Sequence, residues 1–355
     1  MLRVQQNLVQ RLRHARTQAD LFDLLRAAIQ LEHSTIPPYL TALYSLMPGT
    51  NTAVANIISS IVREEMLHIT IAANLLVALG GKPNFSALGF VPSYPGPLPM
   101  QVDDDLQVGL EPFSQTLIYN TFMRIEQPEN PLKLKLKDGS YTNYPSAAAG
   151  QYPTIGDFYE ALIKQLESMK VTWGPASAQV TPETTGTTWF RATDWFPITS
   201  LDDAKRAIHV IVSEGEGATD SPVDNDGDPA HFYRFGQIYY GAQLIQNSDK
   251  SWSYTGADIP FDAKSVFPMT PNAKASMYKE GTRARTLVDS FNQAYMQLLM
   301  GLDAVFSGQP QRLNTVLGLM YQLRILAYDV LTQPDPNNSS NSTGLTFEYV
   351  PVVLS

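Results

Sequence analysis

The chain has 355 residues, of which 44% are hydrophobic and 17% charged, and its formal net charge is −9. This length allows one large domain or two ordinary ones. No apolar run approaches the roughly eighteen residues of a membrane span. The negative net charge argues against non-specific binding to nucleic acid. Because there is no cysteine, disulfides, thiolate metal sites and a cysteine nucleophile are excluded, so any metal must be held by histidine and carboxylate.

The N-terminal segment is predicted to begin the fold as an amphipathic helix. Its apolar positions are Leu2, Val4, Leu8 and Leu12, and the first 19 residues hold four Arg and no acidic residue. This composition is weakly similar to a transit peptide, but no apolar signal core follows. We therefore expect a cytoplasmic protein.

The first long helix is predicted over residues 18–46, where apolar side chains recur at helical spacing from Leu21 to Ile36. Pro37 and Pro38 interrupt it. Since proline lacks the N–H group that bonds the carbonyl four residues earlier, we expect a kink or a restart of the helix at this point.

The second helix is predicted over residues 52–79. It has Asn51 or Thr52 as a capping residue and stops at Gly80-Gly81, which is followed closely by proline.

A Pro- and Gly-rich crossover, residues 82–99, leads to a third predicted helix at 112–127. The segment LKLKLKDGSYTNY alternates with period two around Asp138-Gly139, which indicates a small β-hairpin. An amphipathic helix is expected next, over residues 154–169.

Two further helices are predicted over residues 200–217 and 230–245, with an acidic loop between them. Residues 248–282 look irregular. The last two helices, 284–306 and 311–332, are joined by a short turn and form an αα-hairpin.

No repeat or sharp boundary divides the chain, so we expect a single domain over residues 1–335. Residues 336–355 form a polar tail whose TFEYVPVV segment is compatible with a docked edge strand. The fold class is mainly α: a helical bundle with long irregular insertions, a small β-hairpin and an additional C-terminal helical pair.

Three of the predicted helices each place a Glu in the middle of an apolar stripe: Glu32, Glu65 and Glu126. His68 lies three residues after Glu65, so both side chains project from one helix face. A carboxylate in an apolar interior is costly unless a partner compensates its charge, and a divalent cation is such a partner. Alone, each of these residues is more often a cap or surface residue than a ligand, but together they indicate a metal site.

A bundle with two metals commonly takes one Glu from each of two helices and Glu-x-x-His from two more. The second Glu-x-x-His is absent here. In its place we consider Glu214 or Glu216 at the end of one helix and His231 at the start of the next. We prefer Glu216, which shares a face with Val212. The acidic loop before His231 does not match a calcium loop.

Histidine and carboxylate ligands suit iron, manganese or zinc, and a haem with axial histidines is an alternative. We expect two iron or manganese ions, and the proposed ligands are Glu32, Glu65, His68, Glu126, Glu216 and His231. The side chains of Tyr39, Tyr119 and Tyr233 are candidates for contacts to the cofactor or for radical transfer, although core packing is a simpler role for each.

Five motifs carry a resemblance to a known family: LRAAIQLEHSTIPPYLTALYS, REEMLHITIAANLLVALGGKP, MRIEQPE, EGEG and HFYRFGQI. They resemble the bacterial ferritin-like family of iminophenyl-pyruvate dimer synthase, found in violacein-type pathways. The resemblance covers about residues 20–245. It implies a ferritin-like bundle with two metals at the six positions named above, and oxidative dimerisation of an imine from an aromatic 2-oxo acid.

The leading functional hypothesis is an oxidoreductase of specialised metabolism that uses paired metals and O₂ or peroxide on a small, amino-acid-derived substrate. A ferroxidase or metal store is the alternative, and a binding protein that retains the carboxylates without catalysis is a third. No nucleic-acid or membrane partner is expected, and the oligomeric state stays open.

Overall fold

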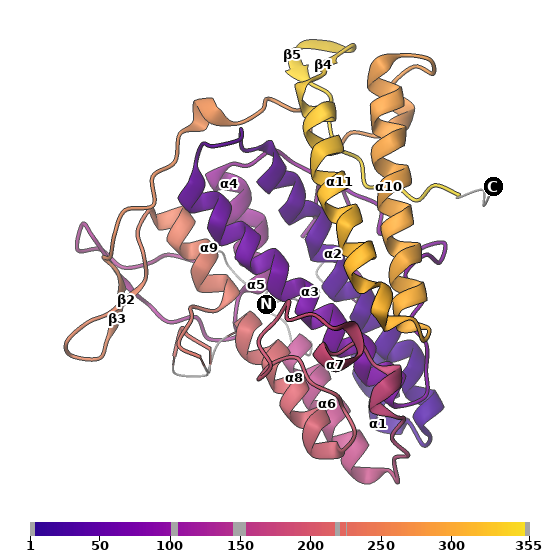
Figure 1. Ribbon diagram of the computed structural model, residues 1–355. Helices are drawn as coiled ribbons and strands as arrows, with labels where there is room; N and C mark the ends of the chain where they lie inside the picture. Colours follow the sequence, from indigo (N-terminus) through magenta and orange to yellow (C-terminus); the bar gives the residue numbers. More distant parts are fainter. Residues whose placement is uncertain (1–3, 101–105, 145–153, 217–220, 225, 352–355) are drawn as a thin grey trace.

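The computed structural model describes residues 4–100, 106–144, 154–216, 221–224 and 226–351, and of Glu216 only the backbone. The predicted helical bundle with irregular insertions is confirmed (Figure 1). Its α-helices are α1 (Gln6–His14), α2 (Phe22–Ser45), α3 (Thr52–Ala78), α4 (Gln115–Leu117), α5 (Met123–Glu126), α6 (Ile155–Ser168), α7 (Pro182–Thr185), α8 (Leu201–Glu216), α9 (His231–Tyr240), α10 (Arg283–Phe306) and α11 (Leu313–Thr332). Its strands are β1 (Lys135–Leu136), β2 (Ile245–Gln246), β3 (Trp252–Tyr254), β4 (Pro334–Asp335) and β5 (Asn338–Ser342).

Helices α2 and α3 form the centre of the molecule and make its most extensive helix–helix contact. Helix α2 runs through Pro37 and Pro38 in one piece, so the prolines do not restart it. The carbonyl of Ser34 cannot bond to residue 38 and instead accepts a hydrogen bond from the hydroxyl of Tyr94 at 2.7 Å. A side chain from the crossover thus satisfies a backbone group that proline leaves free.

The third predicted helix extends over Gln115–Glu126 and contains a π-helical turn, Ile118–Phe122, between α4 and α5. It begins at Ser114, whose hydroxyl accepts a hydrogen bond from the amide of Leu117 at 3.0 Å. Helix α5 ends directly before the Gln-Pro pair at 127 and 128, because the residue before a proline disfavours the α conformation. A π-helical turn inside an α-helix frequently marks a functional site.

Helices α6 and α8 each begin directly after the first residue of the predicted range, and that residue caps the helix. Thr154 and Asp157 form a capping box, in which the Asp157 amide donates to the Thr154 hydroxyl at 3.0 Å. The Asp203 amide donates to the Ser200 hydroxyl at 3.1 Å. These caps fix where the two helices start, and α6 and α8 pack against each other.

Helix α9 ends at Tyr240, earlier than the predicted residue 245. Gly241 ends it by adopting a left-handed conformation with φ 69°. The residues that follow turn away and supply strand β2, which pairs antiparallel with β3.

The predicted hairpin around Asp138-Gly139 is present. Gly139 has φ 87°, and its amide donates to the carbonyl of Leu136 at 3.0 Å. Strand β1 also pairs in parallel with the distant β3, which gives a small sheet of order β1-β3-β2. This sheet lies at the side of the bundle next to α9 (Figure 1).

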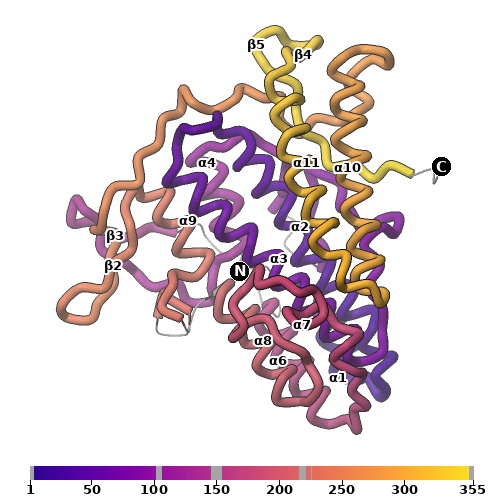
Figure 2. Tube along the Cα trace, in the orientation of Figure 1, coloured from indigo at the N-terminus to yellow at the C-terminus, as the bar shows by residue number. Residues whose placement is uncertain are grey.

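Helices α10 and α11 pack as the predicted hairpin and stand beside α2 and α3 (Figure 2). In the chain after α11, the polar segment forms the β4-β5 hairpin. The residues after it contain no strand as far as the structure describes them, yet Phe347 is buried and Glu348 accepts a hydrogen bond from the amide of Ala275 at 2.9 Å. Within the described ranges, no helix has the length and apolarity needed to cross a bilayer.

Candidate metal centre

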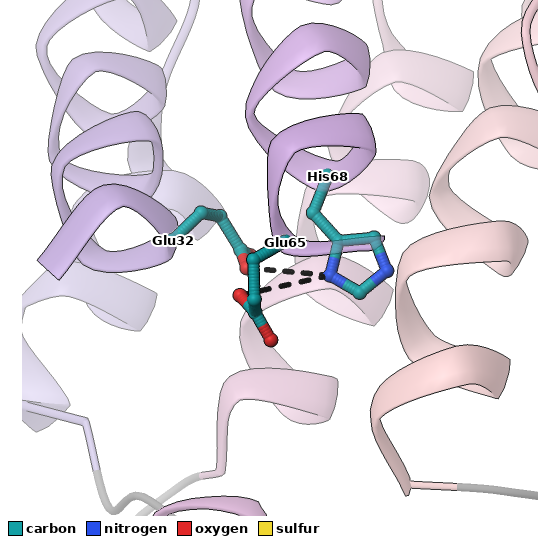
Figure 3. A group of neighbouring side chains, drawn as sticks. All are labelled: Glu32, Glu65 and His68. Carbon is teal, nitrogen blue, oxygen red and sulfur yellow. Dashed lines mark ion pairs between the residues drawn. The ribbon is translucent and has the colours of Figure 1, made fainter. Parts of the chain in front are cut away.

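Helices α2 and α3 bring Glu32, Glu65 and His68 together inside the bundle (Figure 3). The Nδ1 atom of His68 lies 3.7 Å from Oε2 of Glu32 and 4.0 Å from Oε2 of Glu65. The exposed fractions of Glu32, Glu65 and His68 are 8%, 3% and 2%, so all three are buried. Glu65 and His68 share a face because they are three residues apart on α3.

A second group of side chains lies on the other side of Glu65. The Nδ1 atom of His231, at the start of α9, lies 3.0 Å from Oε1 of Glu65 and 3.7 Å from Oε2 of Glu126. His231 is fully buried, and among the residues that the structure describes its Nδ1 has no hydrogen-bond partner of suitable geometry. The imidazole rings of His68 and His231 stack with their centroids 5.4 Å apart.

These five residues, which we call the carboxylate–histidine cluster, have the spacing of metal ligands. Histidine nitrogen and carboxylate oxygen bind divalent ions at about 2.0–2.2 Å, so neighbouring ligand atoms around one ion lie about 3–4 Å apart. The ligand atoms fall into two groups, Glu32, Glu65 and His68, and Glu65, Glu126 and His231, each within 4.8 Å. Glu65 offers one oxygen to each group, as a bridging carboxylate does. The orphaned Nδ1 of His231 fits an ion that would satisfy it.

Two further carboxylates orient the imidazole rings from behind, and we call Glu64 and Glu214 the outer carboxylates. Oε2 of Glu214 lies 3.0 Å from Nε2 of His68, and Oε2 of Glu64 lies 3.0 Å from Nε2 of His231. A carboxylate on the far nitrogen fixes the tautomer, so that each Nδ1 is free to bind a metal. The two histidines therefore have equivalent surroundings.

The outer carboxylates differ from the sequence predictions. Glu64 was not among the predicted ligands, yet its side chain is mostly buried and also accepts a hydrogen bond from Arg234 at 2.7 Å. Between the alternatives on α8, Glu214 contacts His68, whereas the side chain of Glu216 lies outside the described part of the chain. Glu214 is thus placed to support a ligand.

Hydroxyl groups hold the carboxylates of the cluster in place. Tyr159 on α6 donates to Oε1 of Glu32 at 2.6 Å, and Thr35 donates to Oε2 of Glu65 at 3.1 Å. Neither Tyr159 nor Thr35 was predicted from the sequence. The signal for Tyr159 was its place on the apolar face of the helix predicted over 154–169, but nothing local relates that helix to Glu32.

The three tyrosines singled out from the sequence have different surroundings. Tyr39 is fully buried and donates a short hydrogen bond to Oε1 of Glu126. The Tyr119 hydroxyl donates to the carbonyl of Asn143 at 3.2 Å, and the Tyr233 hydroxyl accepts from the amide of Leu132 at 3.1 Å. The structure therefore brings Tyr39 to the cluster and pairs the other two hydroxyls with backbone groups.

Burial and neighbouring charges change how the cluster holds protons. Burial, followed by the charge of Glu126, raises the pKa of Glu65 to about 7. Burial lowers the pKa of His68, but hydrogen bonds to Glu214 and Glu32 outweigh it and raise that pKa to about 10. Burial also opposes charge on His231, yet the surrounding carboxylates raise its pKa well above the ordinary value. Without metal the cluster retains protons, which a divalent cation would displace.

An arginine ties the acidic loop before α9 to the end of α8. The Arg191 guanidinium group lies 2.7 Å from Oδ2 of Asp226, 2.8 Å from Oδ2 of Asp194 and 3.8 Å from Oδ2 of Asp228. Its Nη2 atom is 3.9 Å from Oε1 of Glu214. The side chain of Arg191 is half-exposed. The loop is therefore held next to the outer carboxylate behind His68.

A pocket of about 60 Å³ lies beside the cluster. Its wall is formed by Glu32, Glu65, His68 and Glu126, by the polar residues Thr35, Gln127 and Tyr159, by Gly215, and by the aliphatic residues Leu31, Ile125, Ile155, Ile211 and Val212. A haem is far larger than this pocket, and the stacked imidazoles leave no room for its plane between them. The geometry thus favours single ions over haem.

Comparison with known proteins supports the same type of fold. The ferritin-like family model matches residues 25–240. The crystal structure of a ferritin-like protein from Caulobacter vibrioides is similar, with a TM-score of 0.57 and 24% sequence identity over 88% of this chain and 93% of that chain. At this identity the similarity shows a shared fold. No curated protein sequence matches the chain.

Proposed function

The chain belongs to the ferritin-like family, and on that premise we propose that it is an oxidoreductase with two iron or manganese ions that reacts with O₂ or peroxide. The observation that carries the proposal is the position of Glu65, which offers one oxygen to each of two buried histidine–carboxylate groups. A lone Glu-x-x-His pair would suit one ion, whereas a shared carboxylate suits two adjacent ions.

Each half of the cluster would hold one ion. Glu32 and His68 would bind one, Glu126 and His231 would bind the other, and Glu65 would bind both. Two such ions, when bound, supply redox equivalents and Lewis acidity for reaction with an oxidant. The protein contributes a buried site and ligand positions set by four helices.

The remaining polar groups would maintain this geometry. Glu64 and Glu214 keep each Nδ1 directed at the cluster. Tyr39 and Tyr159 donate to Glu126 and Glu32, one on each half, which limits how far these carboxylates can swing. Both hydroxyls are also near enough to exchange a proton with a carboxylate.

For the organic substrate we propose an imine or 2-oxo acid derived from an amino acid. The support is the resemblance of residues 25–45 and 63–83 to the iminophenyl-pyruvate dimer synthase family. Similarity in the bundle does not by itself transfer a substrate, so this part needs its own test.

Metal content tests the central claim. Protein produced with ample iron or manganese should hold about two equivalents per chain by elemental analysis, as expected of a di-metal carboxylate bundle. Glu65→Gln should lose most of both, while Glu160→Gln on the surface of α6 should keep them. A metal-replete wild type without metal would contradict the proposal. Substrate-dependent O₂ uptake with aromatic 2-oxo acids and an amine oxidase then tests the organic substrate.

The second candidate is a ferroxidase, in which ferrous iron is itself the substrate. The size of the pocket favours it, because about 60 Å³ is small for an organic molecule. Repeated ferrous additions distinguish the two. Oxidation of many irons per chain without any organic substrate indicates a ferroxidase, and arrest after the first two indicates a resident metal pair.

A further inference from the structure

The pocket beside the cluster is small and mostly apolar, which restricts what it can admit. Its volume is about 60 Å³. A cavity that holds one water needs a volume of about 10–15 Å³, and a cavity of about 150 Å³ binds benzene. The pocket therefore suits a ligand of about two to four heavy atoms rather than an aromatic ring.

One side chain in the pocket wall has an unused polar group. Gln127 directly follows Glu126 at the end of α5 and is 4% exposed. Its Oε1 is buried and accepts no hydrogen bond from any residue that the structure describes. Such an orphaned amide is unfavourable unless a ligand or a water pairs with it. Rotation of the amide by half a turn would present its NH₂ group instead, so this position can accept or donate.

A glycine forms part of the pocket wall. Gly215 belongs to α8, where a glycine weakens the helix relative to alanine. A Cβ atom built on Gly215 would meet no described atom within 4 Å. Neither a close contact nor a left-handed backbone therefore explains the glycine. Gly215 lines the pocket, and its lack of a side chain leaves this position of the wall unfilled.

We propose that this pocket is the oxidant site of the protein, which receives O₂ or hydrogen peroxide, and that Gln127 and Gly215 determine its selectivity. The Gln127 amide hydrogen-bonds the bound ligand, and Gly215 keeps the volume that the ligand needs. Larger organic molecules are excluded from this position. The inference rests on the proposed metal pair, since four of the proposed metal ligands line the pocket.

Azide binding tests the inference, because azide is a three-atom ligand of metal centres with hydrogen-bond acceptors at both ends. Iron-loaded protein is titrated with sodium azide, and binding is followed by the change in visible absorption. The variants are Gln127→Leu, Gln127→Met and Gly215→Val. Gly318→Val on α11 is the matched control, since a Cβ at that helical glycine also meets no described atom within 4 Å.

The wild type and Gly318→Val should bind azide equally. Loss of one hydrogen bond to a charged ligand should weaken binding to Gln127→Leu by about tenfold or more. Gly215→Val should bind azide at least about tenfold more weakly, as its side chain takes up ligand volume. Metal content, measured in parallel, should be the same in all of them.

The possible failures are distinguishable. If the wild type holds no iron, the proposed metal pair and the proposed oxidant site are both wrong. If iron and azide both bind, but Gln127→Leu and Gln127→Met stay within about twofold of the wild type, the proposed oxidant contact alone is wrong and the amide pairs only with water. Gln127→Met, which has the same length without the amide's hydrogen-bonding atoms, covers the case in which Gln127→Leu fails to fold.

Discussion

Replacement of Glu64 by Gln tests whether the outer carboxylates are structural parts of the site. Glu64 is flanked by two buried cationic groups: His231 at 3.0 Å and Arg234 at 2.7 Å. Arg234 is 7% exposed, and the Glu64 side chain is 21% exposed. In the metal-free protein, Glu64→Gln removes the negative charge that faces Arg234 and Nε2 of His231, while the shape of the side chain is kept. The variant should therefore be less stable.

The pKa of Glu64 sets the magnitude. Burial acts to raise this pKa, but the hydrogen bond and charge of His231, together with Arg234, lower it from 4.5 to about 2. At about 1.4 kcal/mol per pKa unit, the carboxylate contributes about 3 kcal/mol, and the amide of Gln, which can still accept one hydrogen bond, should recover part of it. We expect a loss of about 2 kcal/mol in the free energy of unfolding at neutral pH.

The pH dependence has a definite sign. Because the folded-state pKa lies below the unfolded value, the contribution of Glu64 is fully present above about pH 4.5 and is lost as the pH falls toward 2. The stability difference between the wild type and Glu64→Gln should therefore shrink in acid. Urea unfolding of the metal-free proteins at neutral pH and near pH 3 measures both effects.

A matched control separates burial from simple ion pairing. Glu160 on α6 also lies 2.7 Å from a cation, Lys164, but their side chains are 62% and 68% exposed. Glu160→Gln should cost only about 0.5 kcal/mol. If Glu64→Gln costs no more than this control, or if its effect is the same in acid, the outer carboxylate does not have the role described.

Four further outcomes are expected. Glu65→Gln should lose both metals at once, whereas Glu32→Gln should keep part of the metal content, as measured by elemental analysis. Since His68 has a pKa raised to about 10 and must lose its proton to bind metal, metal affinity should rise with pH and binding should release protons, which a pH-indicator titration detects. Tyr159→Phe removes the hydrogen bond to Glu32 and should lower the affinity for one of the two metals by several-fold in calorimetric titrations, without changing the fold. Arg191→Met should reduce stability by less than about 1 kcal/mol in urea unfolding, because the arginine is half-exposed and its ion pairs are screened by salt; a larger loss would mean that the acidic loop depends on it.

Much of the bundle could be predicted from local patterns. The caps at Thr154 and Ser200 set where α6 and α8 begin, and helical periodicity located α3 correctly. The prediction was wrong at the end of α9, where apolar periodicity continues past Gly241 but the left-handed glycine stops the helix. The β4-β5 hairpin in the polar tail contacts α11, and its Ser342 pairs through backbone hydrogen bonds with the distant residues Pro268 and Thr270, which no local pattern indicates.

The sequence by itself determined that Glu65 and His68 share one face and that Glu32 and Glu126 lie in apolar surroundings, since the direction of a side chain along a helix follows from its spacing. Only the tertiary structure decided that Glu65 lies between the two histidines, that Glu214 and Glu64 stand behind them, and that the pocket beside them is small. Those relations join helices far apart in the chain, and the packing of whole helices, which no local pattern encodes, sets their distances.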